Sequence, residues 1–197
     1  IIIASKNLEM FGLIAPISSN LKYPNYKIFK KNNLSINKNA PFRVESVDGF
    51  AMILNIKRLK QSDHFSNNNF FDENFFMYLE NDDLCKRINN NNEKIFIVPT
   101  SKIKHLGGKA VNKKYNDEIE LSRNWHWMWS KFYFNKKHKG FLIATLNSFP
   151  TFLSAILKFS FYSIFNHKKK DVYFQRASGF FNALLGNKSY YRPKIKD

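Results

Sequence analysis

The sequence FFDENFFMYLENDDLCKRI spans residues 70–88. Its second half places carboxylates ahead of apolar residues at helical spacing: Glu80, Asp82 and Asp83, then Leu84 and Ile88. The N-terminus of a helix carries partial positive charge, so acidic residues in front of such a pattern mark a helix start. We therefore predict a helix that begins near Glu80 and ends in the asparagine run at residues 89–92.

Apolar runs on both sides of this helix predict buried strands. They cover residues 10–18, the part of residues 47–54 that follows a turn at Gly49, and residues 94–99. Between them lie polar, Lys- and Asn-rich segments, which we interpret as irregular connections. Strands alternating with a helix predict an α/β fold with a mixed sheet.

The C-terminal part has a different character. Residues 123–134 are aromatic and predict a helix, and residues 172–185 predict an amphipathic one. Residues 141–165 are apolar and about long enough to cross a bilayer. Pro150, Lys158 and a basic turn at residues 167–170 favour association in the plane of an anionic membrane surface. The alternative is a helix packed on its own domain.

The chain carries 32 Lys and Arg against 15 Asp and Glu, a net charge of +17. This excess predicts attraction to an anionic partner, although a Lys- and Asn-rich composition alone produces the same sign. We predict no nucleic-acid partner, because no recognised nucleic-acid-binding module is present. The single cysteine, Cys85, excludes an internal disulfide and favours a cytosolic location. The chain begins with Ile and has no signal-peptide pattern, so we expect it to start within a longer protein.

Residues 47–87 resemble the acceptor half of family-2 glycosyltransferases, in particular a rhamnosyltransferase-like group. That group has a Val-x-Gly turn followed by Phe-Asp-Glu-x-Phe-Phe-x-Tyr-x-Glu-Asp-x-Asp-Leu-x-x-Arg. The matching segments here are Val47 to Gly49 and Phe71 to Arg87. The segment Ile103 to Gly108 resembles the strand and His-x-Gly turn that come next in the same proteins.

The resemblance implies a partial A-type glycosyltransferase fold and inverting transfer from a nucleotide-diphosphate sugar to a saccharide acceptor, possibly lipid-linked. It places the enzyme at the cytoplasmic face of the inner membrane, or in the cytoplasm, with a divalent metal, Mg or Mn, as cofactor. The implied catalytic residues are Glu80, Asp82 and Asp83, and His105 is the implied metal ligand. The implied substrate-binding residues are Asp48, Gly49, Asp72, Glu73, Asn81, Arg87 and Trp125. Transfer needs a carboxylate to accept the acceptor proton, and a cation to neutralise the leaving diphosphate.

The sequence departs from the family pattern in two places. Asn81 stands where the family has the acidic residue favoured as general base, and an amide cannot accept that proton. We therefore favour Glu80 or Asp82 as the base and interpret Asp83 as a capping or acceptor-orienting residue. No Asp-x-Asp metal motif occurs in the chain, so we expect its donor-binding half to be absent.

Structural explanations compete with several of these assignments. The acidic cluster fits an ordinary helix N-cap, and a lone histidine such as His105 is usually structural. Asp72 and Glu73 fit a solvated loop, and of Trp125, Trp127 and Trp129 at least one must lie in a core or interface. We expect an acceptor-side domain over residues 1–140 and a membrane-associating appendage over residues 141–197. The rival function is a non-catalytic remnant that docks saccharide or membrane.

Overall fold

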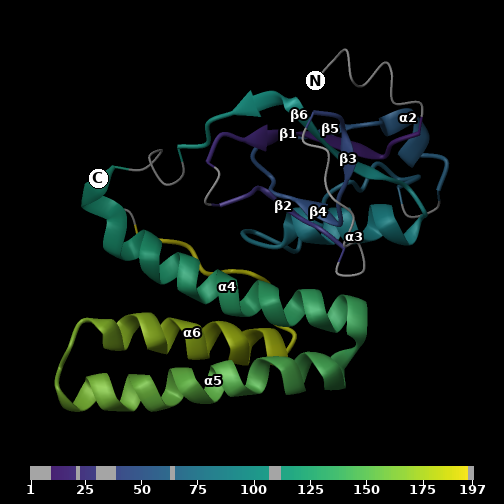
Figure 1. The fold of residues 1–197 in the computed structure, drawn as a ribbon. Helices are drawn as coiled ribbons and strands as arrows, with labels where there is room; N and C mark the ends of the chain where they lie inside the picture. The colour runs from purple at the N-terminus through teal and green to yellow at the C-terminus, as the bar shows by residue number, and fades with distance from the viewer. Residues whose placement is uncertain (1–9, 21–22, 30–38, 63–64, 107–111, 195–197) are drawn as a thin grey trace. The chain divides into compact units, whose positions relative to one another are not determined.

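The computed structural model describes residues 10–20, 23–29, 39–62, 65–106 and 112–194 (Figure 1). Their contacts divide the chain into two compact units. Unit 1 comprises Ile1–Asp72 and Glu80–Gly107, and unit 2 comprises Glu73–Leu79 and Gly108–Asp197. The predicted mixed α/β class is confirmed, because the chain has a four-stranded mixed sheet and several helices. The observed division falls near residue 108, because the helix before residue 140 packs with the C-terminal helices.

Unit 1 is built on a four-stranded mixed sheet. Its order is β3 (Phe42–Arg43), β6 (Ile95–Ile103), β1 (Leu13–Ser18) and β5 (Ile53–Leu54). Strands β1 and β6 are parallel, with Leu13 opposite Ile95, and the two outer strands are antiparallel to their neighbours. A second sheet pairs β2 (Tyr26–Lys27) with β4 (Ser46–Val47).

The predicted strands at residues 10–18 and 94–99 are confirmed, and β6 continues past Pro99 to Ile103. The predicted turn at Gly49 and the strand after it are confirmed, since Gly49 lies in a turn that is followed by β5. The short strand β4 precedes that turn. A four-residue helix, α2 (Ile56–Leu59), follows β5. The strand content of unit 1 therefore comes mainly from the two long parallel strands in its centre.

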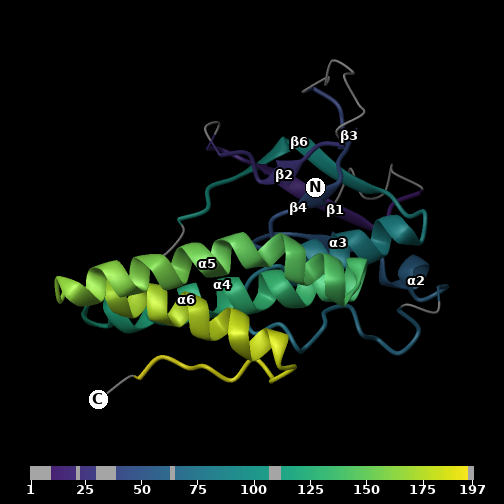
Figure 2. The same ribbon diagram turned by 90° about the horizontal axis from the view of Figure 1, so that it is seen from below.

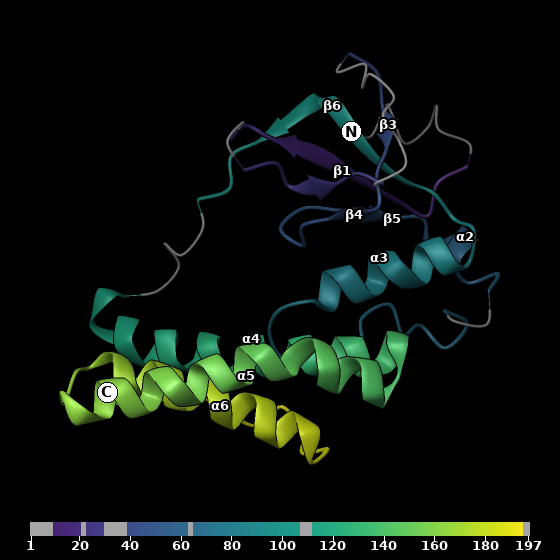
Figure 3. The same ribbon diagram turned by 60° about the horizontal axis from the view of Figure 1, so that its bottom comes forward.

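The predicted helix at the acidic stretch is confirmed as α3 (Glu80–Asn90), which lies beside β4 (Figures 1 and 3). Its inward side chains, Leu84, Cys85 and Ile88, are fully buried and pack with Leu13 and Ile95 of the sheet. Burial of this apolar face fixes which way α3 is turned. The same orientation determines where its N-terminal carboxylates lie.

Unit 2 is helical, and its three long helices lie side by side (Figure 2). After the short 3-10 helix η1 (Lys113–Tyr115) come α4 (Asn116–Lys139), α5 (Phe141–Ile164) and α6 (Lys169–Leu184). The predicted aromatic helix at residues 123–134 is therefore confirmed and extends further at both ends. Gly179 allows α6 to approach α4 closely, since a Cβ there would lie 2.2 Å from the Trp125 carbonyl oxygen.

The segment Glu73–Leu79 is part of unit 2 although α3 follows it directly. The hydroxyl of Ser130 donates to the Met77 carbonyl at 2.7 Å, and the Phe75 ring lies 4.9 Å from that of Tyr133. Both contacts are to α4. They attach the middle of the segment firmly to the helical unit.

Candidate functional site

The candidate site in unit 1 forms where the first turn of α3 meets the turn after β4. The Asn81 side-chain amide donates to the Val47 carbonyl at 2.8 Å, and a Cβ on Gly49 would lie 3.4 Å from the Asn81 Cβ. The two segments of the family resemblance, Val47 to Gly49 and the acidic turn, are therefore adjacent in space. Asn81 contributes here by holding the two turns together.

The Asp48 carboxylate in this site lies within electrostatic reach of Asp82. Desolvation by neighbouring atoms is the main reason why the pKa of Asp48 is raised, and the negative charge of Asp82 raises it further. The positive charges of Lys27 and His105 act in the opposite direction. Lys27 Nζ also contacts Asp82 Oδ1 at 2.7 Å. The site thus combines a proton-accepting group with a cation on an accessible surface, since Asp48 is exposed.

Glu80 is the first residue of α3, and one of its carboxylate oxygens lacks a hydrogen-bond partner in the described part of the chain. Its Oε2 atom is buried and has no hydrogen-bond partner among the described residues. Buried carboxylate oxygens are normally paired, because an unpaired one loses its solvation without compensation. Glu80 therefore has a carboxylate oxygen whose hydrogen-bonding capacity is not used by the described residues.

Asp83 has a different environment from the other carboxylates. Its side chain is fully buried, and Oδ2 accepts from Arg87 Nε at 2.9 Å. The same guanidinium donates to the carbonyls of Asn69 and Phe70 and lies over the Phe65 ring. Through these contacts, Asp83 and Arg87 attach the loop at residues 69–70 to α3. A catalytic role for Asp83 and a substrate-binding role for Arg87 gain no support from this geometry.

His105 follows β6 and stacks on Phe50, with ring centroids 4.6 Å apart and the planes 10° from parallel. The stacking brings the end of β6 against the turn that carries Asp48 and Gly49. Within the described ranges, no three His, Cys, Asp or Glu side chains gather as a metal-binding group. The described residues therefore do not supply a complete site for the divalent metal, and the role of His105 as a ligand stays a prediction. Gly107 and Gly108 of the predicted turn lie outside the described residues.

The remaining predicted substrate contacts lie elsewhere. Asp72 is the last residue of the first unit 1 segment, and Glu73 borders a hollow of about 530 Å³ in unit 2 together with Arg192. Trp125 is 0% exposed and donates from Nε1 to Ser178 Oγ at 3.2 Å. Because no face of its indole is open, Trp125 cannot stack on a sugar in this structure. The expected division of the tryptophans is confirmed: Trp125 and Trp129 are core, and Trp127 is exposed.

Sequence reasoning missed Lys27, which lies 55 residues before Asp82 in the chain. It belongs to a segment rich in lysine and asparagine, where no single lysine is distinguished by pattern. Only the pairing of β2 with β4 brings it to the acidic turn.

In comparisons with known proteins, no family model, no curated protein and no solved structure matches the chain. A function is therefore inferred from the residues of the candidate site and from the motif that they form.

Proposed function

We propose that the chain is the acceptor-side part of an A-type, family-2 glycosyltransferase that acts on a saccharide acceptor at a membrane surface. The observation that carries this proposal is the contact between the Gly49 turn and the first turn of α3, which brings Asp48 within electrostatic reach of Asp82, Lys27 and His105. The motif is the reason for proposing this family. The proximity of its two separate segments is the reason for placing the proposed site there.

In the proposed reaction the acceptor hydroxyl oxygen bonds to the anomeric carbon as the bond to the diphosphate breaks. The hydroxyl proton passes to a carboxylate of unit 1. Asp48 suits this step better than Asp82, because a raised pKa makes a stronger base and Lys27 already pairs with Asp82. Asp48 therefore replaces the family's acidic residue at the Asn81 position, and Glu80 is the rival base.

The test is a transfer assay on the natural gene product with a panel of nucleotide-diphosphate sugars, in which release of nucleoside diphosphate is followed. We expect Asp48→Asn to lower kcat by about 10²- to 10⁴-fold, the usual contribution of a general base. Glu80→Gln tests the rival base. Glu45→Gln, which removes an exposed carboxylate of the same unit, is the matched control.

Full rates in Asp48→Asn, Asp82→Asn and Glu80→Gln alike would contradict the assignment of the base. Absence of transfer from every donor, with saccharide binding retained, would instead favour the rival function of a non-catalytic remnant. The two outcomes are separable, because the first requires measurable turnover.

Helix α5 supports the membrane part of the proposal. It buries small side chains, Ala144, Ser148 and Ala155, against its neighbours. It exposes large ones, including Leu142 at 76%, Leu146 at 72% and Ile164 at 78%. This is the reverse of a water-facing helix, which buries its large apolar residues. A continuous exposed apolar face of this kind marks a surface for lipid or for a partner.

The occupant that we propose for this face is an anionic lipid leaflet. The turn after α5 carries Lys168, Lys169 and Lys170, and each lysine near such a surface contributes about 1 kcal/mol of attraction. By length and composition, α5 is also the one described helix able to cross a membrane. In-plane binding fits better, because α5 packs lengthwise on α4 and α6, whose charged side chains would enter the hydrocarbon with it.

Sedimentation with vesicles tests this surface. We expect binding to phosphatidylcholine vesicles that contain phosphatidylglycerol, weaker binding to phosphatidylcholine alone, and loss of binding in Leu146→Glu/Leu157→Glu. Tyr23→Glu/Ile56→Glu makes the same charge change at exposed apolar positions of unit 1 and should bind normally. Equal loss in both double variants would contradict the assignment of α5 as the membrane surface.

A further inference from the structure

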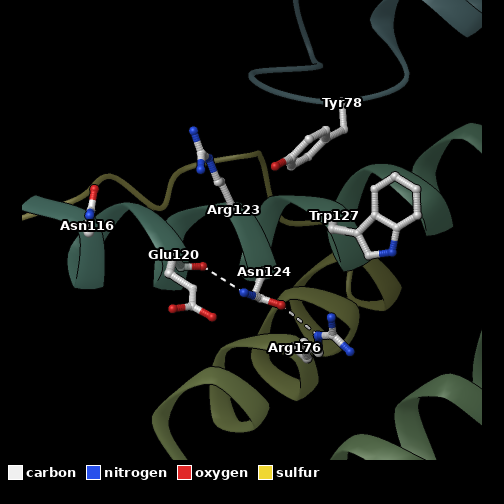
Figure 4. Close-up of a pocket in the computed structure, with 7 residues that line it drawn as sticks. All are labelled: Tyr78, Asn116, Glu120, Arg123, Asn124, Trp127 and Arg176. Carbon is white, nitrogen blue, oxygen red and sulfur yellow. Dashed lines mark hydrogen bonds between the residues drawn. The ribbon is translucent and has the colours of Figure 1, made fainter. Parts of the chain in front are cut away.

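A second hollow, lined only by residues of unit 2, has a volume of about 640 Å³ (Figure 4). Helix α4 supplies most of its wall through side chains on one face: Asn116, Glu120, Arg123, Asn124 and Trp127. Arg176 of α6 and Tyr78 of the segment Glu73–Leu79 complete it. Its volume lies in the range of small-molecule sites, about 300–1,000 Å³.

The hollow has two cationic groups. Arg176 is held in place, since its Nε donates to Asn124 Oδ1 at 2.7 Å, and the Asn124 amide in turn donates to the Glu120 carbonyl at 2.8 Å. Arg123 is exposed, and no ion pair or hydrogen bond is recorded for it among the described residues. A guanidinium with open donors pairs well with a phosphate or carboxylate.

The hollow also has an aromatic wall. The rings of Tyr78 and Trp127 meet edge to face, 5.6 Å apart at 87°, and Trp127 is 42% exposed. Two perpendicular rings leave one indole face available to the apolar side of a ligand. They do not form the parallel slot that would hold a flat base on both sides.

The backbone that presents Tyr78 is strained. Tyr78 and Leu79 have φ angles of 69° and 67°, a left-handed conformation that non-glycine residues rarely adopt. Two such residues in succession cost free energy, which the surrounding contacts must offset, and strain of this kind gathers at ligand sites. Here the two residues come directly after the anchored Met77 and turn the phenol toward α4 (Figure 4).

From these features we infer that the hollow binds an anionic saccharide, with its phosphate or carboxylate on Arg123 and an apolar sugar face on Trp127. The Glu120 carboxylate can accept hydrogen bonds from sugar hydroxyls, and the Asn116 amide can donate hydrogen bonds to them. A ligand with phosphate alone would leave the aromatic wall unused and would face the negative charge of Glu120. The site belongs wholly to unit 2, so it does not depend on the carboxylates of unit 1.

Tryptophan fluorescence provides the binding measurement, because Trp127 is the exposed tryptophan and the other two are buried. The probes are glucose 1-phosphate, glucuronate, methyl glucoside, inorganic phosphate and uridine monophosphate, titrated into the full chain. We expect saturable binding of glucose 1-phosphate or glucuronate at millimolar concentration or below. Both should bind more tightly than methyl glucoside, which has a sugar face but no charge, or inorganic phosphate, which has the charge but no sugar face.

Two variants locate the site, with a third as control. Arg123→Gln should weaken binding of the anionic sugar about tenfold or more, and leave methyl glucoside unchanged. Trp127→Leu should weaken the sugar ligands and leave inorganic phosphate unchanged, as measured by calorimetry because the fluorophore is lost. Lys139→Gln removes a cation from the same helix outside the hollow and should have no effect.

The proposal is wrong if neither anionic sugar binds, or if inorganic phosphate binds as tightly as glucose 1-phosphate. Equal weakening by Arg123→Gln and Lys139→Gln would reduce the effect to general electrostatic attraction and would also overturn it. Tighter binding of uridine monophosphate than of both anionic sugars would assign the hollow to a nucleotide instead.

Discussion

The two units of the chain distribute their apolar side chains in opposite ways. The helix of unit 1, α3, turns large apolar residues such as Leu84 inward against Leu13 and Ile97 and has charged groups at its first turn. Unit 2 has a buried core around Trp125, yet α5 turns leucines outward and alanines inward. The difference supports the proposed division of tasks, in which unit 1 provides the carboxylates for transfer and unit 2 binds the membrane surface.

The chain contains separate reporters for the two units. Its single cysteine, Cys85, is fully buried in unit 1, and burial raises the pKa of the thiol to about 12. Because the thiolate is the reactive form, Cys85 should react with thiol reagents only after unit 1 unfolds. The three tryptophans all lie in unit 2, so their emission follows that unit. Together the two reporters distinguish unfolding of unit 1 from unfolding of unit 2.

The largest effect is expected for Asp83→Asn in unit 1. The substitution leaves the largely buried Arg87 guanidinium without its carboxylate, and breaking such a pair typically costs about 3–5 kcal/mol. The urea midpoint of Cys85 labelling should fall, while the midpoint of tryptophan emission stays unchanged. Asp82→Asn is the control, because its salt bridge is to Lys27, which is 65% exposed. Equal movement of both reporters would show that the two units unfold as one.

A smaller effect is expected for Gly179→Ala in unit 2. The added Cβ would lie 2.2 Å from the Trp125 carbonyl oxygen, so α4 and α6 must separate, at a typical cost of about 1–3 kcal/mol. Helix propensity alone would change the stability in the opposite direction, since alanine in a helix interior is about 1 kcal/mol more favourable than glycine. The tryptophan midpoint should fall and Cys85 labelling should not change. A rise in the tryptophan midpoint would show that the helices do not depend on this close approach.

Local signals in the sequence predict some elements of the two units but not the boundary between them. Periodicity and the acidic run were sufficient for α3 and for the two long strands, since both signals are local. The boundary near residue 108 was not predictable in this way. It depends on α4 packing with α5 and α6, and the amphipathic pattern of a helix does not say which neighbour covers its apolar face.

The candidate site shows the same limit at the level of single residues. The motif identified a group of acidic residues, but it could not separate Asp83, which pairs with Arg87 inside the fold, from Asp82, which faces Lys27. Nor could it favour Trp127 over Trp125, because only the packing of α6 decides which indole is covered. Arg123 and Arg176 meet at one hollow although 53 positions separate them, and no local pattern reports such a meeting.

The smallest predicted effect is a pH dependence of opposite sign in the two units. In unit 2, burial lowers the pKa of His126 below 6.5, and the nearby Arg192 charge lowers it further, against the opposing effect of its hydrogen bond to the Tyr191 carbonyl. The unfolded chain therefore binds this proton more tightly. His126 stabilises unit 2 fully above pH 6.5, and this contribution is lost as the pH falls through the lower pKa of the folded state. The tryptophan midpoint should thus decrease between pH 7 and pH 5.

The control for this effect is His126→Gln, which keeps a donor for the Tyr191 carbonyl and removes the titration. Its tryptophan midpoint should depend less on pH than that of the unmodified chain. In unit 1 the raised pKa of Asp48 has the reverse consequence, because the folded state binds that proton more tightly and gains stability as acid is added. Asp48→Asn should therefore remove a stabilising trend in Cys85 labelling at the acidic end. Unchanged pH slopes in both variants would mean that other groups set the pH dependence of the two units.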